Sequence, residues 1–259
     1  GSEEIIGGKA KQLMMITPEY VPYWIAITSD CPDDKLSDAV EFAVQDIVNK
    51  INYLGQTGTD NRFAIRSSAT SEDGDSQSYA GIFESKLNVP ITEVYSAVQE
   101  VRQSARDSKV KAYSGTDDDH NIAVLIMPMI NATWSGVLFS KEPVEGTDKM
   151  LLEWDKGVGG VVDGTSDTSH VFLGTGDNIS EHMTSIYDGR TIKLPELDEL
   201  PTEQVIKLWN EAKRLENNYN QPVDIEWAIV KHNFNSDTQL SILQVRPITT
   251  LGASNGKSQ

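Results

Sequence analysis

The 259-residue sequence has little cysteine, few basic residues and no long apolar run. Its single cysteine, Cys31, excludes an internal disulfide and any multi-cysteine metal site, which fits a reducing compartment. No run of about 18 apolar residues occurs and no charged-then-apolar leader is visible, so we expect no membrane span and a cytoplasmic location. The 39 acidic residues outnumber the 22 basic ones, and the formal net charge of -17 excludes a basic surface for nucleic acid or an anionic membrane.

The residues that are present predict a globular α+β protein of two lobes. At 38% hydrophobic content the chain can bury a sizeable core. Apolar spacing predicts helices over 37–54, 92–105 and 201–215, and strands over 24–28, 63–65, 122–127, 135–140, 149–154, 168–173, 223–230 and 240–245. We place the lobe boundary near 120–130, which gives a first lobe over 3–125, a second over 126–250 and a disordered polar tail over 251–259.

Two local predictions accompany these elements. The strand at 63–65 is predicted to lead into a loop, Arg66–Gly74, that is too small and too rich in hydroxyl groups to be core. Thr92 is predicted to cap the second helix, because a threonine side chain can accept a hydrogen bond from the first helical turn.

The last two predicted strands carry the clearest chemical signal. Side chains alternate across a strand, so Asp224 and Glu226 share one face while Trp227 points into the core. An antiparallel hairpin would place Glu226 opposite Gln244 and Asp224 opposite Arg246. Carboxylate and amide oxygens suit Mg²⁺, and a guanidinium balances phosphate charge. A solvent-facing sheet with a surface salt bridge is the alternative interpretation.

Earlier segments add further groups that suit phosphate. Arg66 offers a planar fork of donors, and Lys9 follows two glycines. Gly81 permits a close backbone approach, and the Ser85 hydroxyl can join the backbone N–H groups around a phosphate. Each residue taken alone is more typical of a surface or a turn.

Taken in order, the motifs resemble the ATP-binding domain of the pyruvate phosphate dikinase and phosphoenolpyruvate synthase family, which rifampicin phosphotransferases and glucan water dikinases share. The resemblance spans nearly the whole chain. It rests on Gly7–Leu13, Val21-Pro22, Ile65–Asp73, Ala80–Ser85, Ser135–Ser140, Gly157–Gly164, Asp224–Trp227 and Leu243–Pro247.

The resemblance implies an ATP-grasp architecture, in which two α/β lobes clamp ATP with Mg²⁺. It implies that Lys9, Arg66 and Arg246 contact the phosphates and act in catalysis, and that Gly81 and Ser85 form a lid loop. Glu226 and Gln244 would hold the magnesium, and the adenine would lie near Met127, Pro128 and Met129. Because Pro128 lacks a backbone N–H, base selectivity at that position is an open question.

The family passes its phosphoryl group to a histidine on a separate swivelling domain, which we do not expect to find within residues 1–259. The segment Thr168-Ser169-His170 superficially resembles that histidine site, but its apolar surroundings predict a strand. His120, His182 and His232 lie in polar segments without partners at metal spacing. Glu72 and Asp73 could hold a second metal, although solvation is the simpler reading of a polar loop.

Three functions follow from these observations. The first is a Mg-ATP-dependent phosphotransferase of dikinase type, which cleaves ATP and passes a phosphoryl group to a histidine carrier domain or another acceptor. The second is a standalone ATP-grasp kinase or ligase that acts directly on a small acceptor. The third is a nucleotide-binding module without turnover, which the combination of Arg66, Glu226, Gln244 and Arg246 disfavours.

Overall fold

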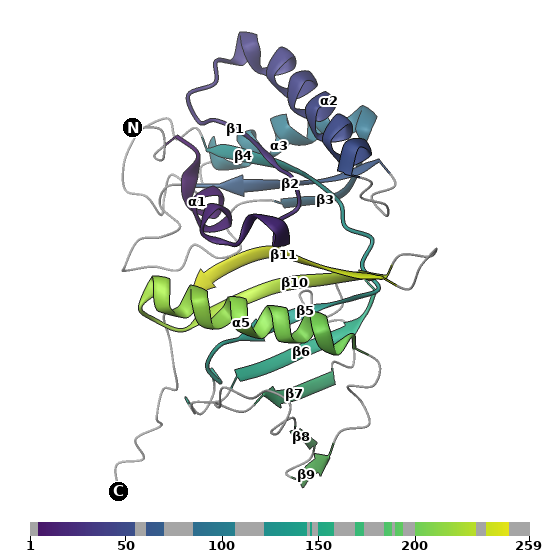
Figure 1. Cartoon of the computed structure of the whole chain (residues 1–259). Coiled ribbons are helices and arrows are strands. Elements are labelled where there is room, and N and C mark those ends of the chain that lie inside the picture. The colour runs from purple at the N-terminus through teal and green to yellow at the C-terminus, as the bar shows by residue number, and fades with distance from the viewer. Residues whose placement is uncertain are drawn as a thin grey trace, which may run out of the picture. The chain divides into compact units, whose positions relative to one another are not determined.

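The computed structural model describes residues 5–54, 61–69, 85–106, 122–143, 146, 150–157, 169–173, 184–187, 190–193, 200–231 and 237–248. The chain divides into two compact units, and each combines helices with antiparallel sheet (Figure 1). Unit 1 contains Gly1–Met14 and Pro22–Ile130, and unit 2 contains Met15–Val21 and Asn131–Gln259. The predicted α+β class is therefore confirmed.

Unit 1 is built on a four-stranded antiparallel sheet in the order β1-β4-β2-β3. Its strands are β1 (Ile25–Ile27), β2 (Arg62–Ser68), β3 (Ser85–Pro90) and β4 (Ala123–Pro128). The α-helices are α1 (Gly7–Met15, of which Met15 belongs to unit 2), α2 (Leu36–Leu54) and α3 (Val94–Arg106), and the 3-10 turns are η2 (Asp33–Lys35) and η4 (Ile91–Glu93).

The core of unit 1 lies between the sheet and the helices α2 and α3. Phe63 and Ile65 of β2 pack there against apolar residues of both helices. Because side chains alternate along β2, Ala64 and Arg66 lie on the opposite face of the sheet. The hydrophobic core therefore covers one face of the sheet, and the other face carries Ala64 and Arg66.

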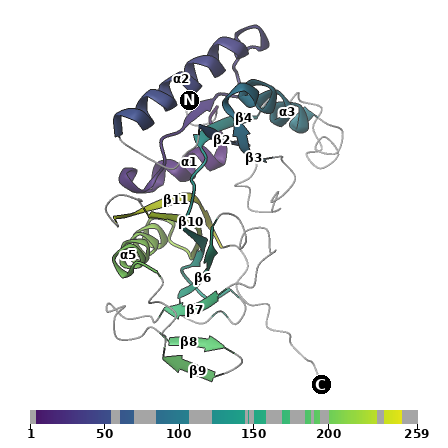
Figure 2. The same cartoon turned by 90° about the vertical axis from the view of Figure 1, so that its right-hand side faces the viewer.

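Unit 2 is built on a seven-stranded antiparallel sheet in the order β11-β10-β5-β6-β7-β8-β9. Its elements are η1 (Pro18–Tyr20), β5 (Trp134–Phe139), β6 (Met150–Lys156), β7 (Ser169–Leu173), β8 (Thr184–Tyr187), β9 (Arg190–Lys193), α5 (Thr202–Tyr219), β10 (Val223–Lys231) and β11 (Thr238–Pro247). Helix α5 lies along one side of the β10–β11 hairpin (Figure 2).

The face of the hairpin under α5 is the core of unit 2. Ile225, Trp227 and Val245 are at most 1% exposed, and they alternate with the residues of the opposite face. Truncation of Trp227 to alanine would cost about 3–5 kcal/mol, because it removes a large and fully buried side chain. Helix α5 ends at Tyr219 and is capped by Asn220, which adopts the left-handed conformation with φ of 52°.

Several sequence predictions need correction. Arg66, Ser67 and Ser68 belong to strand β2 and not to a loop. Both serines are buried, and their hydroxyl groups form hydrogen bonds with Lys9 and Ala10 of α1. Thr92 lies inside the turn η4 and caps no helix, since Pro90 precedes that turn and α3 begins at Val94. The division between the two units falls between Ile130 and Asn131, at the end of the interval 120–130.

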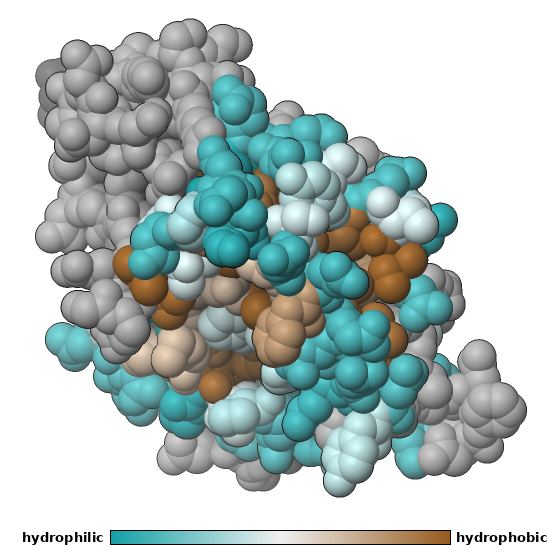
Figure 3. Space-filling view, turned by 90° about the horizontal axis from the view of Figure 1, so that it is seen from above, coloured by the Kyte–Doolittle hydropathy of each residue, from teal (hydrophilic) through white to brown (hydrophobic). Residues whose placement is uncertain are grey.

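The exposed surface is mixed in character. In the view from above, hydrophobic and hydrophilic residues of the described part of the chain both reach the visible face (Figure 3). Among the described residues, no helix combines the length and the apolar character that a membrane crossing requires.

Candidate functional site

The β10–β11 hairpin has the register that the sequence predicts. Glu226 is the direct partner of Gln244, and Asp224 is the direct partner of Arg246. Directly opposed residues of an antiparallel pair point to the same face, so all four side chains lie on the face opposite Trp227. Glu226 and Gln244 are each only 8% exposed, which brings a carboxylate and an amide together in a sheltered position.

A β-bulge adjoins this group. Glu226 pairs with Gln244, but the next residue, Trp227, pairs with Ile242, so Leu243 is an extra residue in β11. A bulge bends the strand and increases its twist locally. It therefore changes the direction of the hairpin directly beside the Glu226–Gln244 pair, as bulges next to functional sites often do.

Asp224 holds Arg246 through a bifurcated hydrogen bond. The Arg246 Nε donates to both carboxylate oxygens of Asp224 at 2.9 Å. Burial raises the pKa of Asp224 above its ordinary value and the charge of Glu226 adds to the effect, while the charge and hydrogen bonds of Arg246 act in the opposite direction without cancelling it. Asp224 thus orients a guanidinium that is itself 46% exposed and able to reach a ligand.

In unit 1, Arg66 and Ser85 are direct partners across β2 and β3. The pair occupies the sheet face turned away from α2 and α3, since the neighbouring Lys86 contacts Glu100 of α3 on the other face. Ser85 is the first residue of β3, so it forms part of a strand and not of the predicted lid loop. The structure nevertheless places Ser85 beside Arg66, where both can bind one anion.

Helix α1 is fixed to the end of β2 by its first turn. The Gly8 N–H donates to the Ala69 carbonyl at 2.9 Å, and the Ala10 N–H donates to Ser68 Oγ at 3.1 Å. Gly7 has φ of +75°, and a Cβ there would stand 2.0 Å from the Ser68 carbonyl oxygen, so only glycine permits this approach. Lys9 Nζ consequently lies 3.4 Å from the Oγ of Ser67, the residue that follows Arg66 in β2.

The end of β4 carries the predicted adenine-contacting residues. Met127 is the partner of Ala64 and only 2% exposed, so it shares the sheet face of Arg66. Met129 is partly buried, and its backbone N–H donates to the Arg62 carbonyl at 2.8 Å. The side chain of Met129 can therefore contact a base, but its N–H is already used.

Two backbone groups at this position escaped the sequence prediction. Because Met127 and Met129 turn their backbone groups toward β2, the alternation of an antiparallel ladder turns those of Pro128 and Ile130 the other way. Strand β1 pairs with β4 only as far as Ile126. The Pro128 carbonyl and the Ile130 N–H therefore have no ladder partner among the described strands, a feature that only the register could reveal.

The donor set fits a magnesium ion that shares its coordination with a nucleotide. Among the described residues, no group of three or more His, Cys, Asp or Glu side chains could hold a metal. Mg²⁺ is commonly bound by one or two protein oxygens together with phosphates and water, so it needs no such cluster. The carboxylate of Glu226 and the amide oxygen of Gln244 meet that smaller requirement.

Other predicted residues fall outside the described part of the chain. These residues are Gly81, Glu72, Asp73, His120, His182 and His232, together with the predicted tail over 251–259. His170 lies in strand β7, paired with Glu153 of β6, so the strand prediction for that segment is confirmed.

Comparison with known proteins settles the family. The family model described as "Pyruvate phosphate dikinase, AMP/ATP-binding domain" matches residues 26–259. The chain belongs to this family. The match begins after Lys9, so the place of Lys9 in the site rests on the docking of α1 against β2.

The curated relatives of this family member are phosphotransferases. It is 34% identical over 235 residues to a protein from Methanothermobacter thermautotrophicus described as "Probable phosphoenolpyruvate synthase", covering 82% of this chain and 34% of that protein. It is 29% identical over 231 residues to "Rifampicin phosphotransferase" from Bacillus subtilis, covering 80% of this chain and 26% of the relative. The chain thus spans about a third or less of these relatives.

Among solved structures, "dinucleotide forming Acetyl-coenzyme A synthetase 1" from Ca. Korarchaeum cryptofilum aligns with a TM-score of 0.47 and 10% identity. The alignment covers 93% of this chain and 91% of that one. A similarity of this size is too weak to carry a structural or functional argument.

Proposed function

We propose that this ATP-binding domain binds Mg-ATP and works as the nucleotide-cleaving part of a dikinase-type phosphotransferase. The observation that carries the proposal is the sheltered Glu226–Gln244 pair, set beside the Asp224–Arg246 pair on one sheet face of a member of this family. Two hard oxygen donors beside an oriented guanidinium form a combination suited to a metal-bound polyphosphate.

In this proposal, Glu226 and Gln244 hold Mg²⁺ and Arg246 contacts a phosphate. The metal, when bound, neutralises charge that shifts between phosphate oxygens during transfer. Arg246 can do the same without leaving its place, because Asp224 already holds its Nε at 2.9 Å. Groups that are oriented before the reaction lower the barrier by positioning and by electrostatic stabilisation.

Unit 1 carries the other residues that the family resemblance assigns to the phosphates and the base. Arg66 with Ser85, and Lys9 beside Ser67, provide two cations and two hydroxyl groups on β2, β3 and α1. At the end of β4, the Pro128 carbonyl can accept from the adenine amine and the Ile130 N–H can donate to the adjacent ring nitrogen. Met127 and Met129 would pack against the base.

The phosphoryl acceptor is a histidine of a carrier domain. Relatives that this chain matches over about a third of their length are described as phosphoenolpyruvate synthases, and the family is named for a dikinase. A dikinase-type reaction releases AMP, because one phosphoryl group of ATP goes to the histidine and the other to water or inorganic phosphate, whereas direct transfer of one group from ATP to a small acceptor releases ADP.

Calorimetric titration and product analysis test this function. The protein should bind ATP tightly only when Mg²⁺ is present, and should form AMP and phosphohistidine when a carrier domain from a relative is added. ADP formation with a small acceptor would instead indicate a standalone kinase or ligase. Binding without any turnover under all of these conditions would leave a nucleotide-binding module and defeat the proposal.

A further inference from the structure

The sheet face that carries Glu226 continues onto β5 and β6 of the same unit. Val137 of β5 is the direct partner of Glu226 on one side and of Glu153 on the other. Directly opposed residues of antiparallel strands point to the same face, so Glu153 shares the face of the Glu226–Gln244 pair. Glu153 lies two strands away from Glu226, which corresponds to about 10 Å between their Cα atoms.

The alternation of burial along β5 and β6 agrees with this placement. Leu138, Leu152 and Trp154 are buried and belong to the core face of the sheet. Val137 and Glu153, which alternate with them, are only partly buried. The side chains of Val137 and Glu153 are therefore accessible from the face that carries Glu226.

The chemistry of Glu153 differs from that of a phosphate contact. An ionised glutamate only accepts hydrogen bonds, and its negative charge repels phosphate oxygens. Val137, between Glu153 and Glu226, offers an apolar surface and no polar contact. An apolar side chain bordered by one hydrogen-bond acceptor suits a flat ring that carries an N–H.

A close approach of β5 and β6 fixes the backbone of Glu153. A Cβ at Gly136 would stand 1.9 Å from the Glu153 carbonyl oxygen, so the two strands can approach this closely only because residue 136 is glycine. Glu153 therefore projects from a rigid part of the sheet, and a group positioned in this way can orient a reactant before the reaction.

We propose that Glu153 orients the histidine that accepts the phosphoryl group, while the imidazole ring packs on Val137. The inference rests on the proposed function, in which a carrier domain supplies that histidine. One ring N–H donates to the Glu153 carboxylate, and this hydrogen bond leaves the lone pair on the other ring nitrogen, directed away from Glu153.

The transfer step then follows from this orientation. The lone pair forms an N–P bond with a phosphorus atom of the nucleotide, the P–O bond to the leaving phosphate oxygen breaks, and its electron pair goes to that oxygen. The imidazole ring becomes positively charged as the N–P bond forms. The Glu153 carboxylate stabilises this charge from the N–H that it holds.

Single-turnover transfer separates this role from nucleotide binding. Glu153→Gln keeps the size of the side chain and removes its charge. With Mg-ATP bound and a carrier domain from a relative added at saturation, we expect phosphohistidine formation to slow about tenfold. We expect the Mg-ATP affinity measured by calorimetric titration to stay within about twofold, because Glu153 contacts the acceptor and not the nucleotide.

Asp155→Asn is the matched control. Asp155 lies on the same strand and the same face, and its Oδ1 accepts the Lys156 N–H at 2.6 Å. We expect Asp155→Asn to leave both the transfer rate and the affinity unchanged. Glu153→Asp keeps the charge and should transfer faster than Glu153→Gln, with circular dichroism showing both variants folded; equal rates would contradict a role for the charge.

The other outcomes separate the two proposals. A normal transfer rate in Glu153→Gln overturns the inference while the proposed function stands. A weaker Mg-ATP affinity that accounts for the slower transfer would make Glu153 a contact to the nucleotide, for example to a ribose hydroxyl, and would also overturn it. If the unchanged protein binds Mg-ATP but forms no phosphohistidine with the carrier domain, the proposed function fails and the inference fails with it.

Discussion

Glu226 of β10 lies directly opposite Gln244 of β11, and each side chain is only 8% exposed. Polar side chains on a sheet face that meets water are usually exposed, so the burial of this pair sets it apart from an ordinary solvent-facing sheet. A metal ion bound to a nucleotide gives both oxygens a function that a salt-bridged surface would not require. The low exposure of this pair therefore favours a nucleotide site over the solvent-facing alternative for this hairpin.

Replacing Glu226 by glutamine should separate metal-dependent from metal-independent binding. The variant keeps the size of the side chain but loses the negative charge that favours Mg²⁺. We expect the affinity for ATP with Mg²⁺ to fall about tenfold or more, equivalent to about 1.4 kcal/mol or more, and the affinity without Mg²⁺ to change little. Calorimetric titration with and without Mg²⁺ measures both, and equal affinities for the variant and the unchanged protein would remove Glu226 from the metal site.

Asp224 should reduce stability as the pH rises. Because burial raises its pKa in the folded state, the folded protein binds the proton more strongly than the unfolded chain does. The contribution of this group therefore falls between its ordinary value of 3.8 and the higher folded pKa. In Asp224→Asn that component should be missing from the pH dependence of the unfolding free energy measured by chemical denaturation. An unchanged pH dependence would contradict the raised pKa.

Glu211 of α5 should change stability with pH in the opposite direction to Asp224. Burial acts to raise its pKa, but hydrogen bonds from Arg214 and Thr17 and the charge of Arg214 outweigh it, so the pKa lies below the ordinary 4.5. The stability that Glu211 provides is complete above 4.5 and is lost as the pH falls through the folded pKa. Denaturation of Glu211→Gln across that window should lack this acid-induced loss. Glu203→Gln is the matched control and should retain it, because Glu203 lies on the same helix and is 77% exposed.

Gly7 should tolerate no side chain. Gly7→Ala would place a methyl group 2.0 Å from the Ser68 carbonyl oxygen at φ of +75°, so we expect a loss of more than about 1 kcal/mol of unfolding free energy. Gly157→Ala is the matched control, because its φ of +88° is equally unfavourable but nothing lies within 4 Å of the added carbon. Equal losses in the two variants would show that the contact with β2 contributes nothing.

The end of β4 should select adenine over hypoxanthine. Inosine presents a carbonyl and an N–H where adenosine presents an amine and a bare ring nitrogen, which reverses the pattern matched by the Pro128 carbonyl and the Ile130 N–H. We expect Mg-ITP to bind about tenfold or more weakly than Mg-ATP, the difference of roughly 1.4 kcal/mol that one mismatched polar contact produces. Competition titrations measure the ratio, and equal affinities would place the base elsewhere.

The sequence predicted the hairpin well because alternation and pairing depend on few variables. Once Trp227 is assigned to the core, the faces of Glu226, Gln244 and Arg246 follow, and one turn sets the register. Helix α1 could not be predicted in the same way, since its two leading glycines disfavour a helix and its stability comes from contacts with a distant strand.

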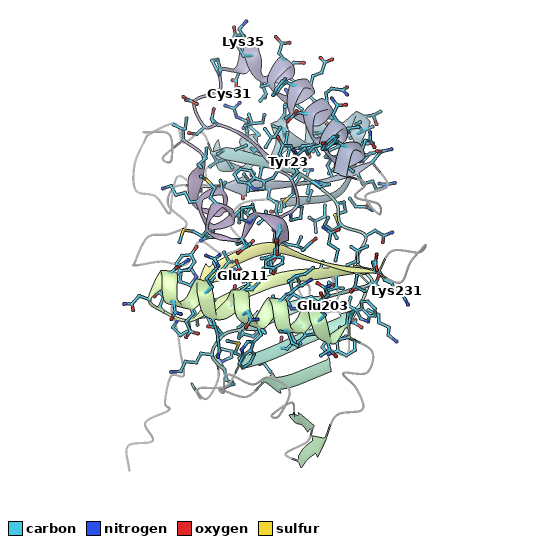
Figure 4. All side chains as sticks on the ribbon, viewed as in Figure 1. Tyr23, Cys31, Lys35, Glu203, Glu211 and Lys231 are labelled. Carbon is cyan, nitrogen blue, oxygen red and sulfur yellow. The ribbon has the colours of Figure 1, made fainter. Side chains whose placement is uncertain are left out.

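Tertiary contacts also explain why the sequence did not predict some other features of the structure. Ser67 and Ser68 read as loop residues because hydroxyl groups seldom enter a core, yet α1 satisfies them inside β2. The hairpin β8–β9 carries no strong periodic signal over its short strands, so the sequence does not predict it. Glu211 of α5 is buried (Figure 4), but it lies at a polar position of an amphipathic helix, where nothing in the local pattern distinguishes it from a solvated residue.

The extra residue in β11 allows a variation in chain length that the rest of the hairpin does not. If Leu243 were deleted, Ile242 and Gln244 would become neighbours and would still point to opposite sides, so the ladder would become regular without reversing a single side chain. A deletion elsewhere in the paired strands would shift the register and turn the side chains beyond it to the other face of the sheet. Orthologues that differ by one residue at this position could therefore retain the same chemistry, with only the curvature of the strand altered.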